Sequence, residues 1–266
     1  MNPNPSLQKI WSVMSEEARE RARSEPMLAS FYHATVLNHE SLCSALAYVL
    51  AEKLEASMLP SMLLRETIDE ATLADPRIVA AMAADLCAHR TRDPACDSYI
   101  TPFLHFKGFH ALQAHRVAHY LWKNDRQWMA YMLQNRCASR FDVDIHPGAV
   151  MGSGIMVDHG GGIVIGETAQ LGDNVSMLHE VTLGGSGTGG GKRHPKIGNN
   201  VLIAAGVAIL GPLSVGEGAK IGAGSVVLND VNPHETVAGV PAESVGRKLR
   251  RAPAFDMDQR FGGLPG

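Results

Sequence analysis

Two glycine-rich segments of this 266-residue sequence each contain a histidine directly beside a charged residue. Asp158-His159 precedes three glycines, and Arg193-His194 ends a glycine-rich stretch. A histidine normally titrates near neutral pH, so it can take a proton from a hydroxyl group under physiological conditions. A guanidinium can form paired hydrogen bonds with a carboxylate. The two segments are therefore candidates for proton transfer and for anion binding.

A six-residue repeat surrounds both segments and determines what can position them. An aliphatic residue recurs at thirteen positions, with two slips of phase: Ile145, Met151, Val157, Ile165, Leu171, Met177, Leu183, Ile197, Ile203, Ile209, Val215, Ile221 and Val227. A period of six fits neither an α-helix nor an alternating strand. It predicts a triangular prism in which each hexapeptide forms one side and three hexapeptides form one coil.

The two segments that carry the histidines are the two interruptions of this repeat. The first lies at 158–162 and the second at 185–196. Interruptions of a regular solenoid are the first places to look for functional residues. The second segment is not a phosphate-binding P-loop, because Ser186 stands where the first glycine is required and Arg193 replaces the final Ser/Thr. A surface insertion without function is the alternative for this segment.

The chain divides by composition into two parts and a tail. Of 27 glycines, only Gly108 precedes Gly148. We predict an α-helical domain at 1–141, a parallel β-helix at 142–245 and a C-terminal tail at 246–266, which together make an α+β fold. Pro60 and Pro76 suit the first turns of helices, and a long amphipathic run follows from 104 to 137.

Four histidines in that run raise the question of a metal site: His105, His110, His115 and His119. His115 and His119 have the spacing of one helical turn, but the glutamate of an HExxH motif is missing and no third ligand is indicated. Helix packing is the favoured interpretation, so we expect no metal site.

Bulk composition argues against several classes of protein. The net charge of −3 gives no basic excess to neutralise nucleic-acid phosphates. No apolar stretch reaches the roughly 18 residues of a membrane span, and the N-terminus does not resemble a secretory signal. The four cysteines form no CxxC pair, which argues against a disulfide framework or a zinc ribbon. A cytoplasmic protein is expected.

The repeat resembles that of the hexapeptide-repeat acyltransferases. More specific segments, at 92–95, 107–113, 144–147, 154–159, 182–185, 193–197 and 239–242, resemble the serine acetyltransferase family, and the resemblance covers nearly the whole chain. It implies a left-handed β-helix and transfer of an acetyl group from acetyl-CoA to the hydroxyl of L-serine. The products would be O-acetyl-L-serine and CoA, in the first step of cysteine biosynthesis.

The resemblance also implies roles for individual residues. His159 would be the general base, and Asp144 would orient its imidazole as the carboxylate of a catalytic triad does. The fifteen residues between them are close to one coil, so the two can lie on adjacent coils. Arg193 suits the serine carboxylate, while Asp93 and Asp158 suit the ammonium group.

His194 would contact serine or the oxyanion. Asp93 alone would be read as a helix-end turn residue. Acetyl-CoA would lie along the prism near Gly184, Gly185, Ala205 and Ala223, although small residues also suit the corners of a prism. With no cysteine well placed to carry the acetyl group and no permanently bound cofactor expected, serine would attack directly in a ternary complex.

Partners follow from the same resemblance. It implies trimers with active sites between neighbouring prisms, two trimers joined through the helical domains, and feedback inhibition by L-cysteine. Relatives insert a tail ending in isoleucine into O-acetylserine sulfhydrylase, whereas this chain ends in Gly266, so we expect that complex to be disfavoured. The alternatives are another hydroxyl acceptor (homoserine, a sugar or an antibiotic), a zinc carbonic anhydrase on the same prism, and a non-catalytic scaffold.

Overall fold

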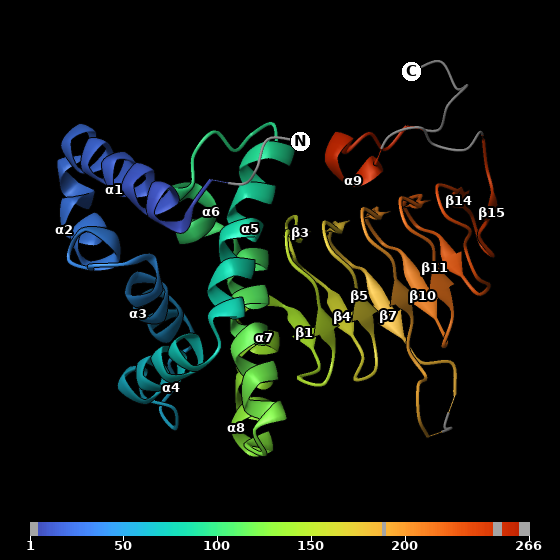
Figure 1. Ribbon diagram of the computed structural model, residues 1–266, viewed down its shortest axis with the longest axis horizontal. Helices are drawn as coiled ribbons and strands as arrows, with labels where there is room; N and C mark the ends of the chain where they lie inside the picture. Colours follow the sequence, from blue (N-terminus) through green and yellow to red (C-terminus); the bar gives the residue numbers. More distant parts are fainter. Residues whose placement is uncertain (1–4, 188–189, 247–251, 261–266) are drawn as a thin grey trace.

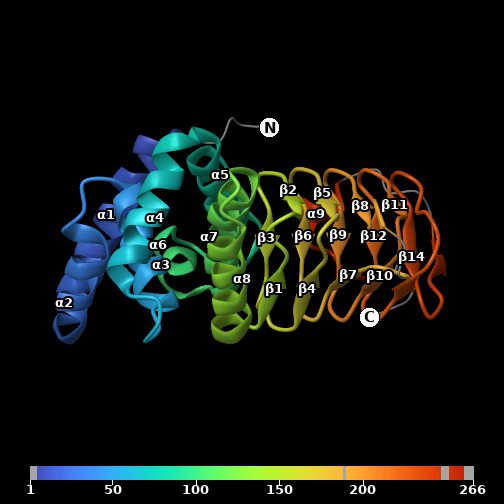
Figure 2. The same cartoon turned by 90° about the horizontal axis from the view of Figure 1, so that it is seen from below.

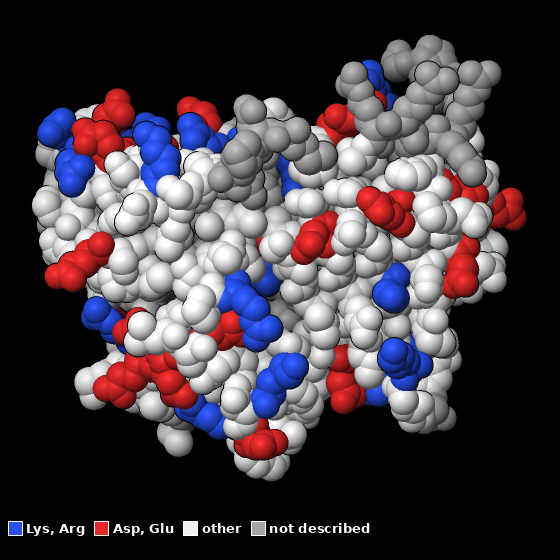
Figure 3. Space-filling view, viewed as in Figure 1, with Lys and Arg blue, Asp and Glu red and all other residues white. Residues whose placement is uncertain are grey.

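Helices occupy one end of the molecule and short strands occupy the other (Figure 1). The computed structural model describes residues 5–187, 190–246 and 252–260. Seen from below, α8 lies beside the first strands, and the coils then follow one another along the long axis (Figure 2). Basic and acidic side chains are interspersed over the face drawn in Figure 3, as expected for a chain of small net charge.

The helical part contains short and long helices with local signals at several ends. They are α1 (Leu7–Ser24), η1 (Pro26–Leu28), α2 (Ala29–Tyr32), η2 (His33–Leu37), α3 (Leu42–Leu54), α4 (Ser61–Ala74), α5 (Pro76–Arg92), α6 (Ile100–His105), α7 (Lys107–Lys123) and α8 (Gln127–Phe141). Pro76 is the first residue of α5 and follows the N-cap Asp75, as predicted for a first-turn proline. Pro60 instead precedes α4 as its N-cap. The predicted run at 104–137 is interrupted twice, because Phe106 separates α6 from α7 and a turn with Asp125 at φ 57° separates α7 from α8.

The β-helix consists of strands of two or three residues that form three sheets. They are β1 (Val143–Ile145), β2 (Val150–Met151), β3 (Met156–Val157), β4 (Ile163–Ile165), β5 (Gln170–Leu171), β6 (Ser176–Met177), β7 (Thr182–Gly184), β8 (Lys196–Ile197), β9 (Leu202–Ile203), β10 (Ala208–Leu210), β11 (Ser214–Val215), β12 (Lys220–Ile221), β13 (Val226–Val227), β14 (Thr236–Ala238) and β15 (Glu243–Ser244). The sheet orders are β1-β4-β7-β10-β13, β11-β8-β5-β2 and β15-β14-β12-β9-β6-β3. All pairings are parallel except β14 with β15. The predicted fold class, a helical region followed by a parallel β-helix, is confirmed.

The register between strands records the interruptions of the repeat. Lys196 pairs with Ser214, a regular coil of eighteen residues. Val143 pairs with Ile163, which lengthens the first coil by two residues, and Gln170 pairs with Lys196, which lengthens a later coil by eight. Both insertions loop out without breaking the stack, so the residues they contain are free to form a site.

The interior of the prism is filled by two aliphatic columns rather than one. Twelve of the thirteen predicted positions are buried, and Met151 is half-buried. The residue two positions earlier also points inward, as Val143, Ile155, Val181 and Val201 do with exposures of 1% or less. Burial of both columns is the main source of stability for a solenoid whose coils contact only their neighbours.

The helical part covers the open end of the prism and satisfies its exposed backbone groups. Arg116 donates to the Gly152 carbonyl at 2.8 Å, and the fully buried Asp85 accepts a hydrogen bond from the Ile155 amide at 2.9 Å. Asp85 also pairs with Arg116 at 2.8 Å. His119 donates to the Pro147 carbonyl, and His110 donates to the Phe103 carbonyl. These contacts fix α5 and α7 against the first coil and give two of the four histidines structural partners.

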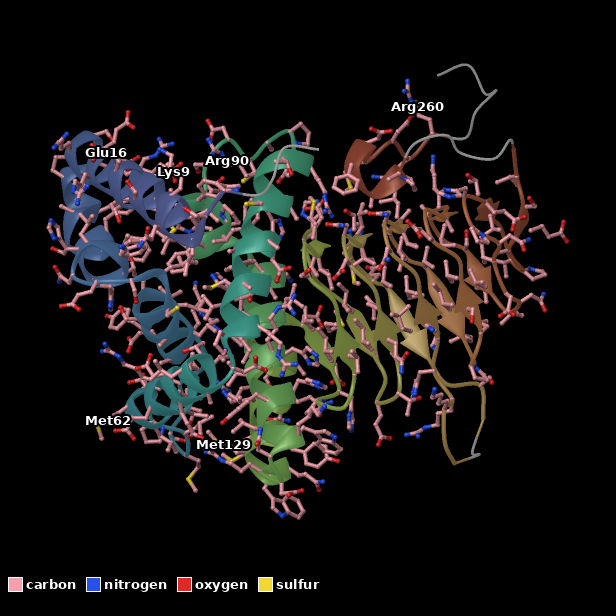
Figure 4. All side chains as sticks on the ribbon, viewed as in Figure 1. Lys9, Glu16, Met62, Arg90, Met129 and Arg260 are labelled. Atoms are coloured by element: carbon pink, nitrogen blue, oxygen red, sulfur yellow. The ribbon has the colours of Figure 1, made fainter. Side chains whose placement is uncertain are left out.

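The C-terminal segment returns across the sheet that contains β6. Ala254, in α9 (Pro253–Asp256), is fully buried, and its carbonyl accepts a hydrogen bond from Ser176. The Arg260 carbonyl accepts one from Lys220 at 2.6 Å, and the Arg260 side chain points away from the prism (Figure 4). Much of the predicted tail at 246–266, including Gly266, lies outside the described residues. None of the described helices has the length and hydrophobicity needed to cross a membrane.

Candidate active site

The first interruption presents His159 at a corner of the prism. The two extra residues form a turn between β3 and β4, in which His159 and Gly160 have φ values of 59° and 75°. The His159 side chain is 73% exposed, and its Nε2 lies 3.8 Å from Oδ2 of the half-buried Asp158. Its ring packs edge-on against His179, with 5.7 Å between the ring centroids. The turn therefore leaves an imidazole open to solvent beside a carboxylate.

An open cavity of about 470 Å³ adjoins this imidazole. Its lining residues come from the start of α7, the turn before β1 and two successive corners: Lys107, Asp142, His159, Gly161, Gly162, His179 and Glu180. Helix α7 can pack closely against β3 because Gly108 has no side chain. A Cβ at this position would lie only 2.3 Å from the Val157 carbonyl oxygen. The Asp142 carboxylate accepts a hydrogen bond from the Gly162 amide at 2.8 Å, which fixes the floor of the cavity.

Six of these lining residues were not among the predicted site residues: Lys107, Asp142, Gly161, Gly162, His179 and Glu180. The register could have identified His179, because Val157 pairs with Met177 and the same offset places residue 179 directly beside His159. Lys107 and Asp142 reach the cavity through the packing of α7 and of the turn after α8. No spacing in the sequence signals that packing.

The corner that carries His159 continues along the prism through small residues. Met177 pairs with Ile203 and Ile203 with Ile221, so the residues that follow His179 at this corner are Ala205 and Ala223. Backbone hydrogen bonds join these turns, from Gly206 to His179 and from Gly224 to Ala205. Both predicted CoA-contacting alanines therefore lie in line with His159, on later coils.

A second cluster forms at the other end of the strands in the β1-β4-β7-β10-β13 sheet, at the next corner of the prism. Arg193 Nη2 donates to Glu167, while the backbone amides of Arg193 and His194 donate to Thr168 Oγ1 at 3.0 and 3.2 Å. Glu167 and Thr168 follow β4, whereas His159 precedes it. The second interruption is thus held at the corner where this sheet ends.

Hydrogen bonds in this cluster settle which nitrogen of His194 can donate. The Thr168 amide donates to Nδ1 at 3.2 Å, so the neutral ring carries its proton on Nε2. Nε2 occupies the space above Gly166, where a Cβ would lie only 2.0 Å away. Gly185 lies against the same ring, and Gly184 lies on β7 at this edge. His194 therefore presents a hydrogen-bond donor.

Electrostatics in the second cluster favour an ionised carboxylate and a neutral imidazole. The hydrogen bond from Arg193 holds the pKa of Glu167 below its usual range. Burial, and then the charge of Arg193, lowers the pKa of His194. The lowered pKa of its ring leaves His194 as a neutral donor near pH 7, because burial and the charge of Arg193 outweigh the opposing charge of Glu167.

Two predicted site residues lie outside the cavity of His159. Asp144 is the middle residue of β1, and its Oδ1 accepts a hydrogen bond from Gln134 Nε2 at 2.6 Å. Asp93 follows α5, and its Oδ1 accepts one from the Ala95 amide at 2.8 Å. Over the described ranges, neither side chain lines the cavity. The same ranges contain no group of three His, Cys, Asp or Glu side chains suited to a metal ion.

Within one chain, eight of the ten predicted site residues therefore form two groups. His159, Asp158, Ala205 and Ala223 lie at or beside one edge of the sheet, whereas Arg193, His194, Gly184 and Gly185 lie at the other. The three-residue strand between the edges spans about 10 Å. Within the described residues of one chain, neither Arg193 nor His194 lines the cavity of His159.

Comparisons with known proteins agree over nearly the whole chain. The family model "Serine acetyltransferase, N-terminal" matches residues 10–114, and "Bacterial transferase hexapeptide (six repeats)" matches residues 194–229. A serine acetyltransferase of Escherichia coli (strain K12) is 55% identical over 97% of this chain and 94% of its own length.

Three solved structures with bound ligands are also similar. A serine acetyltransferase in complex with cysteine is 50% identical, with a TM-score of 0.95 over 96% of this chain and all of the other. The serine complex of the Neisseria gonorrhoeae enzyme is 53% identical, with a TM-score of 0.86 over 88% and 96% of the two chains. The coenzyme A complex of the enzyme from Brucella abortus strain S19 is 47% identical, with a TM-score of 0.89 over 91% and 96%.

Proposed function

The chain belongs to the serine acetyltransferase family, and we propose that His159 is the general base with which it acetylates L-serine. Acetyl-CoA is the co-substrate of this acyltransferase. The observation that carries the proposal is the exposed imidazole of His159, which lines the 470 Å³ cavity. The same corner of the prism continues through the small residues Ala205 and Ala223 on later coils. The family name and the serine-bound relative support L-serine as the acceptor.

The reaction needs a base because a neutral serine hydroxyl is a poor nucleophile. His159 takes the hydroxyl proton while the serine oxygen bonds to the thioester carbonyl carbon. When the tetrahedral intermediate collapses, the carbon–sulfur bond breaks and the imidazolium returns the proton to the leaving CoA thiolate. The described cavity lining contains no cysteine that could carry the acetyl group, which supports direct attack in a ternary complex.

Different charged side chains would bind the carboxylate and the ammonium group of serine. Arg193 would pair with the substrate carboxylate, and Asp93 and Asp158 would accept hydrogen bonds from the ammonium group. His194 would direct its Nε2 proton towards serine or towards the oxyanion. Gly184, Gly185, Ala205 and Ala223 would allow the backbone to approach acetyl-CoA closely.

Asp144 would orient the imidazole of His159 and stabilise the imidazolium, by the role that triad carboxylates perform. Asp158 is the carboxylate in contact with His159 within one chain, at 3.8 Å. Replacing each with asparagine separates the two roles. Asp144→Asn should lower kcat, whereas Asp158→Asn should mainly raise KM for serine; the reverse pattern would assign the orienting role to Asp158.

A second copy of the chain would complete each site. The two clusters lie at opposite edges of one sheet, so rotation of identical prisms into a trimer can place His159 of one copy beside Arg193 of the next. Met27, Leu28 and Phe31 are exposed at the far end of the helical part, Met27 by 98%. These apolar side chains support an interface that joins two trimers into a hexamer.

Regulation and location follow from the chemistry of the substrate and of the chain. L-cysteine differs from L-serine by one atom, and a relative has been solved with cysteine bound, so we propose competitive feedback inhibition at the serine site. The four cysteines are free, which supports the reducing cytoplasm as the compartment of a cysteine-biosynthesis enzyme.

The test is release of CoA thiol from acetyl-CoA across a panel of acceptors. L-serine should give the highest kcat/KM, well above L-homoserine, a galactoside or chloramphenicol. A higher value for one of the other acceptors would favour the alternative acetyltransferase. No release with any of them would indicate a scaffold.

A further inference from the structure

Gln134 is the side chain that holds the Asp144 carboxylate. Its Nε2 donates to Asp144 Oδ1 at 2.6 Å, a short distance for an amide and a carboxylate. Asp144 lies on β1 between Val143 and Ile145, whose side chains fill the prism. The carboxylate therefore points out of the prism, towards α8.

The segment between Gln134 and Asp144 consists of the end of α8, one turn residue and the start of β1. Helix α8 ends at Phe141, a single residue at φ 59° (Asp142) turns the chain, and β1 begins at Val143. On α8, Leu133 and Cys137 flank Gln134 and are buried, with exposures of 1% and 5%. Both partners of the hydrogen bond are thus placed by packed secondary structure, so the bond can fix the rotamer of the carboxylate.

The chemical type of this donor matters as much as its position. An amide donates to a carboxylate without carrying a charge, so Asp144 keeps its full negative charge. A lysine or arginine at position 134 would neutralise that charge. Oδ1 is occupied by Gln134, which leaves Oδ2 to accept an imidazole N–H.

We propose that Gln134 is a positioning residue for acetyl transfer. It fixes the Asp144 carboxylate so that one oxygen and the whole charge remain available to the imidazolium formed in the transition state. The inference rests on the proposed role of Asp144. It adds that Gln134, on the neighbouring helix α8, holds the Asp144 carboxylate in place for that role. Gln134 acts through Asp144 and need not touch either substrate.

Gln134→Met tests this proposal, since methionine has a similar length and no donor. We expect kcat to fall about tenfold, the scale of one hydrogen bond to a charged group, with KM for L-serine and for acetyl-CoA within about twofold. Gln134→Glu should lower kcat further, because a second carboxylate would repel Asp144. Gln127→Met, the same change at an exposed position on the same helix, should leave kcat unchanged.

A double-mutant cycle separates failure of this inference from failure of the proposed function. With Asp144→Asn already present, Gln134→Met should cause no further loss of kcat. If Asp144→Asn alone lowers kcat and Gln134→Met does not, the positioning role is wrong while the function of Asp144 stands. If Asp144→Asn is fully active, the proposed function of Asp144 fails first. Equal losses of kcat from Gln134→Met in both backgrounds would mean that Gln134 acts independently of Asp144.

Discussion

The separation of His159 from Arg193 predicts that two inactive variants restore each other when they assemble together. His159 precedes β4, whereas Arg193 contacts Glu167, which follows β4, and the strand between these two corners of the prism spans about 10 Å. If each site takes His159 from one copy and Arg193 from its neighbour, His159→Ala and Arg193→Ala damage different halves of it. Each variant alone should have very low activity.

The expected recovery follows from counting sites in mixed trimers. With equal amounts of the two variants, the chain that supplies His159 must be the Arg193→Ala chain, and its neighbour must be the His159→Ala chain. In a trimer that contains both variants, one of the three neighbouring pairs meets both conditions, so about a third of the sites are intact. Mixed trimers that carry both tags should then recover about a third of the wild-type rate.

Co-expression of the two variants with different affinity tags, followed by purification through both tags, provides the sample. CoA thiol release with saturating L-serine and acetyl-CoA provides the rate. Separately purified variants, mixed without exchange of subunits, are the control and should stay inactive. If the mixed oligomers are no more active than the separate variants, the shared site is refuted.

Two further predictions concern the second cluster and the buried histidines. Gly166→Ala should lower kcat/KM roughly 10- to 100-fold, because the new Cβ would overlap Nε2 of His194. Gly187→Ala is the control and should leave kcat/KM unchanged, because the space around Gly187 is open. Equal kcat/KM values for the two variants would contradict this prediction. Burial lowers the pKa of His89, His110 and His115 to about 3, so below pH 6.5 the unfolded chain binds more protons than the folded chain does. The contribution of these histidines to the free energy of unfolding should therefore be constant above pH 6.5 and decrease as the pH falls towards 3. At pH 5 the loss should be roughly 2 kcal/mol per histidine. Urea unfolding at pH 7.5 and pH 5 measures this loss, which should be smaller in His110→Gln; a loss as large as in the wild type would argue against the role of His110.

The prism could be predicted because its period is written in the sequence. Ile203, Ile209 and Val215 are buried as the six-residue spacing predicts. The second inward column, with Val181 and Val201, has the same period but was not predicted. Several of its positions hold small residues or proline instead of large aliphatic residues, so its hydrophobic pattern is weaker in the sequence. The break between α7 and α8 was also missed, because neither glycine nor proline marks the turn at Asp125.

The candidate site was predictable only in part, because a repeat gives the position of a residue along the prism but not its neighbours across helices. The histidines of both interruptions stood out by type and place. The partners of His159 depend on the packing of α7, which brings Lys107 to the cavity. The partner of Asp144 depends on α8, and the contact between Arg193 and Glu167 depends on how the inserted loop folds back.

The proton-accepting role of His159 is tested most directly by the rate of His159→Ala with L-serine and acetyl-CoA. His159 is 73% exposed, so its removal should leave the fold intact, as circular dichroism and the oligomer size would verify. We predict that kcat falls by about 10² to 10⁴. A folded His159→Ala protein that turns over at the wild-type rate would contradict the mechanism.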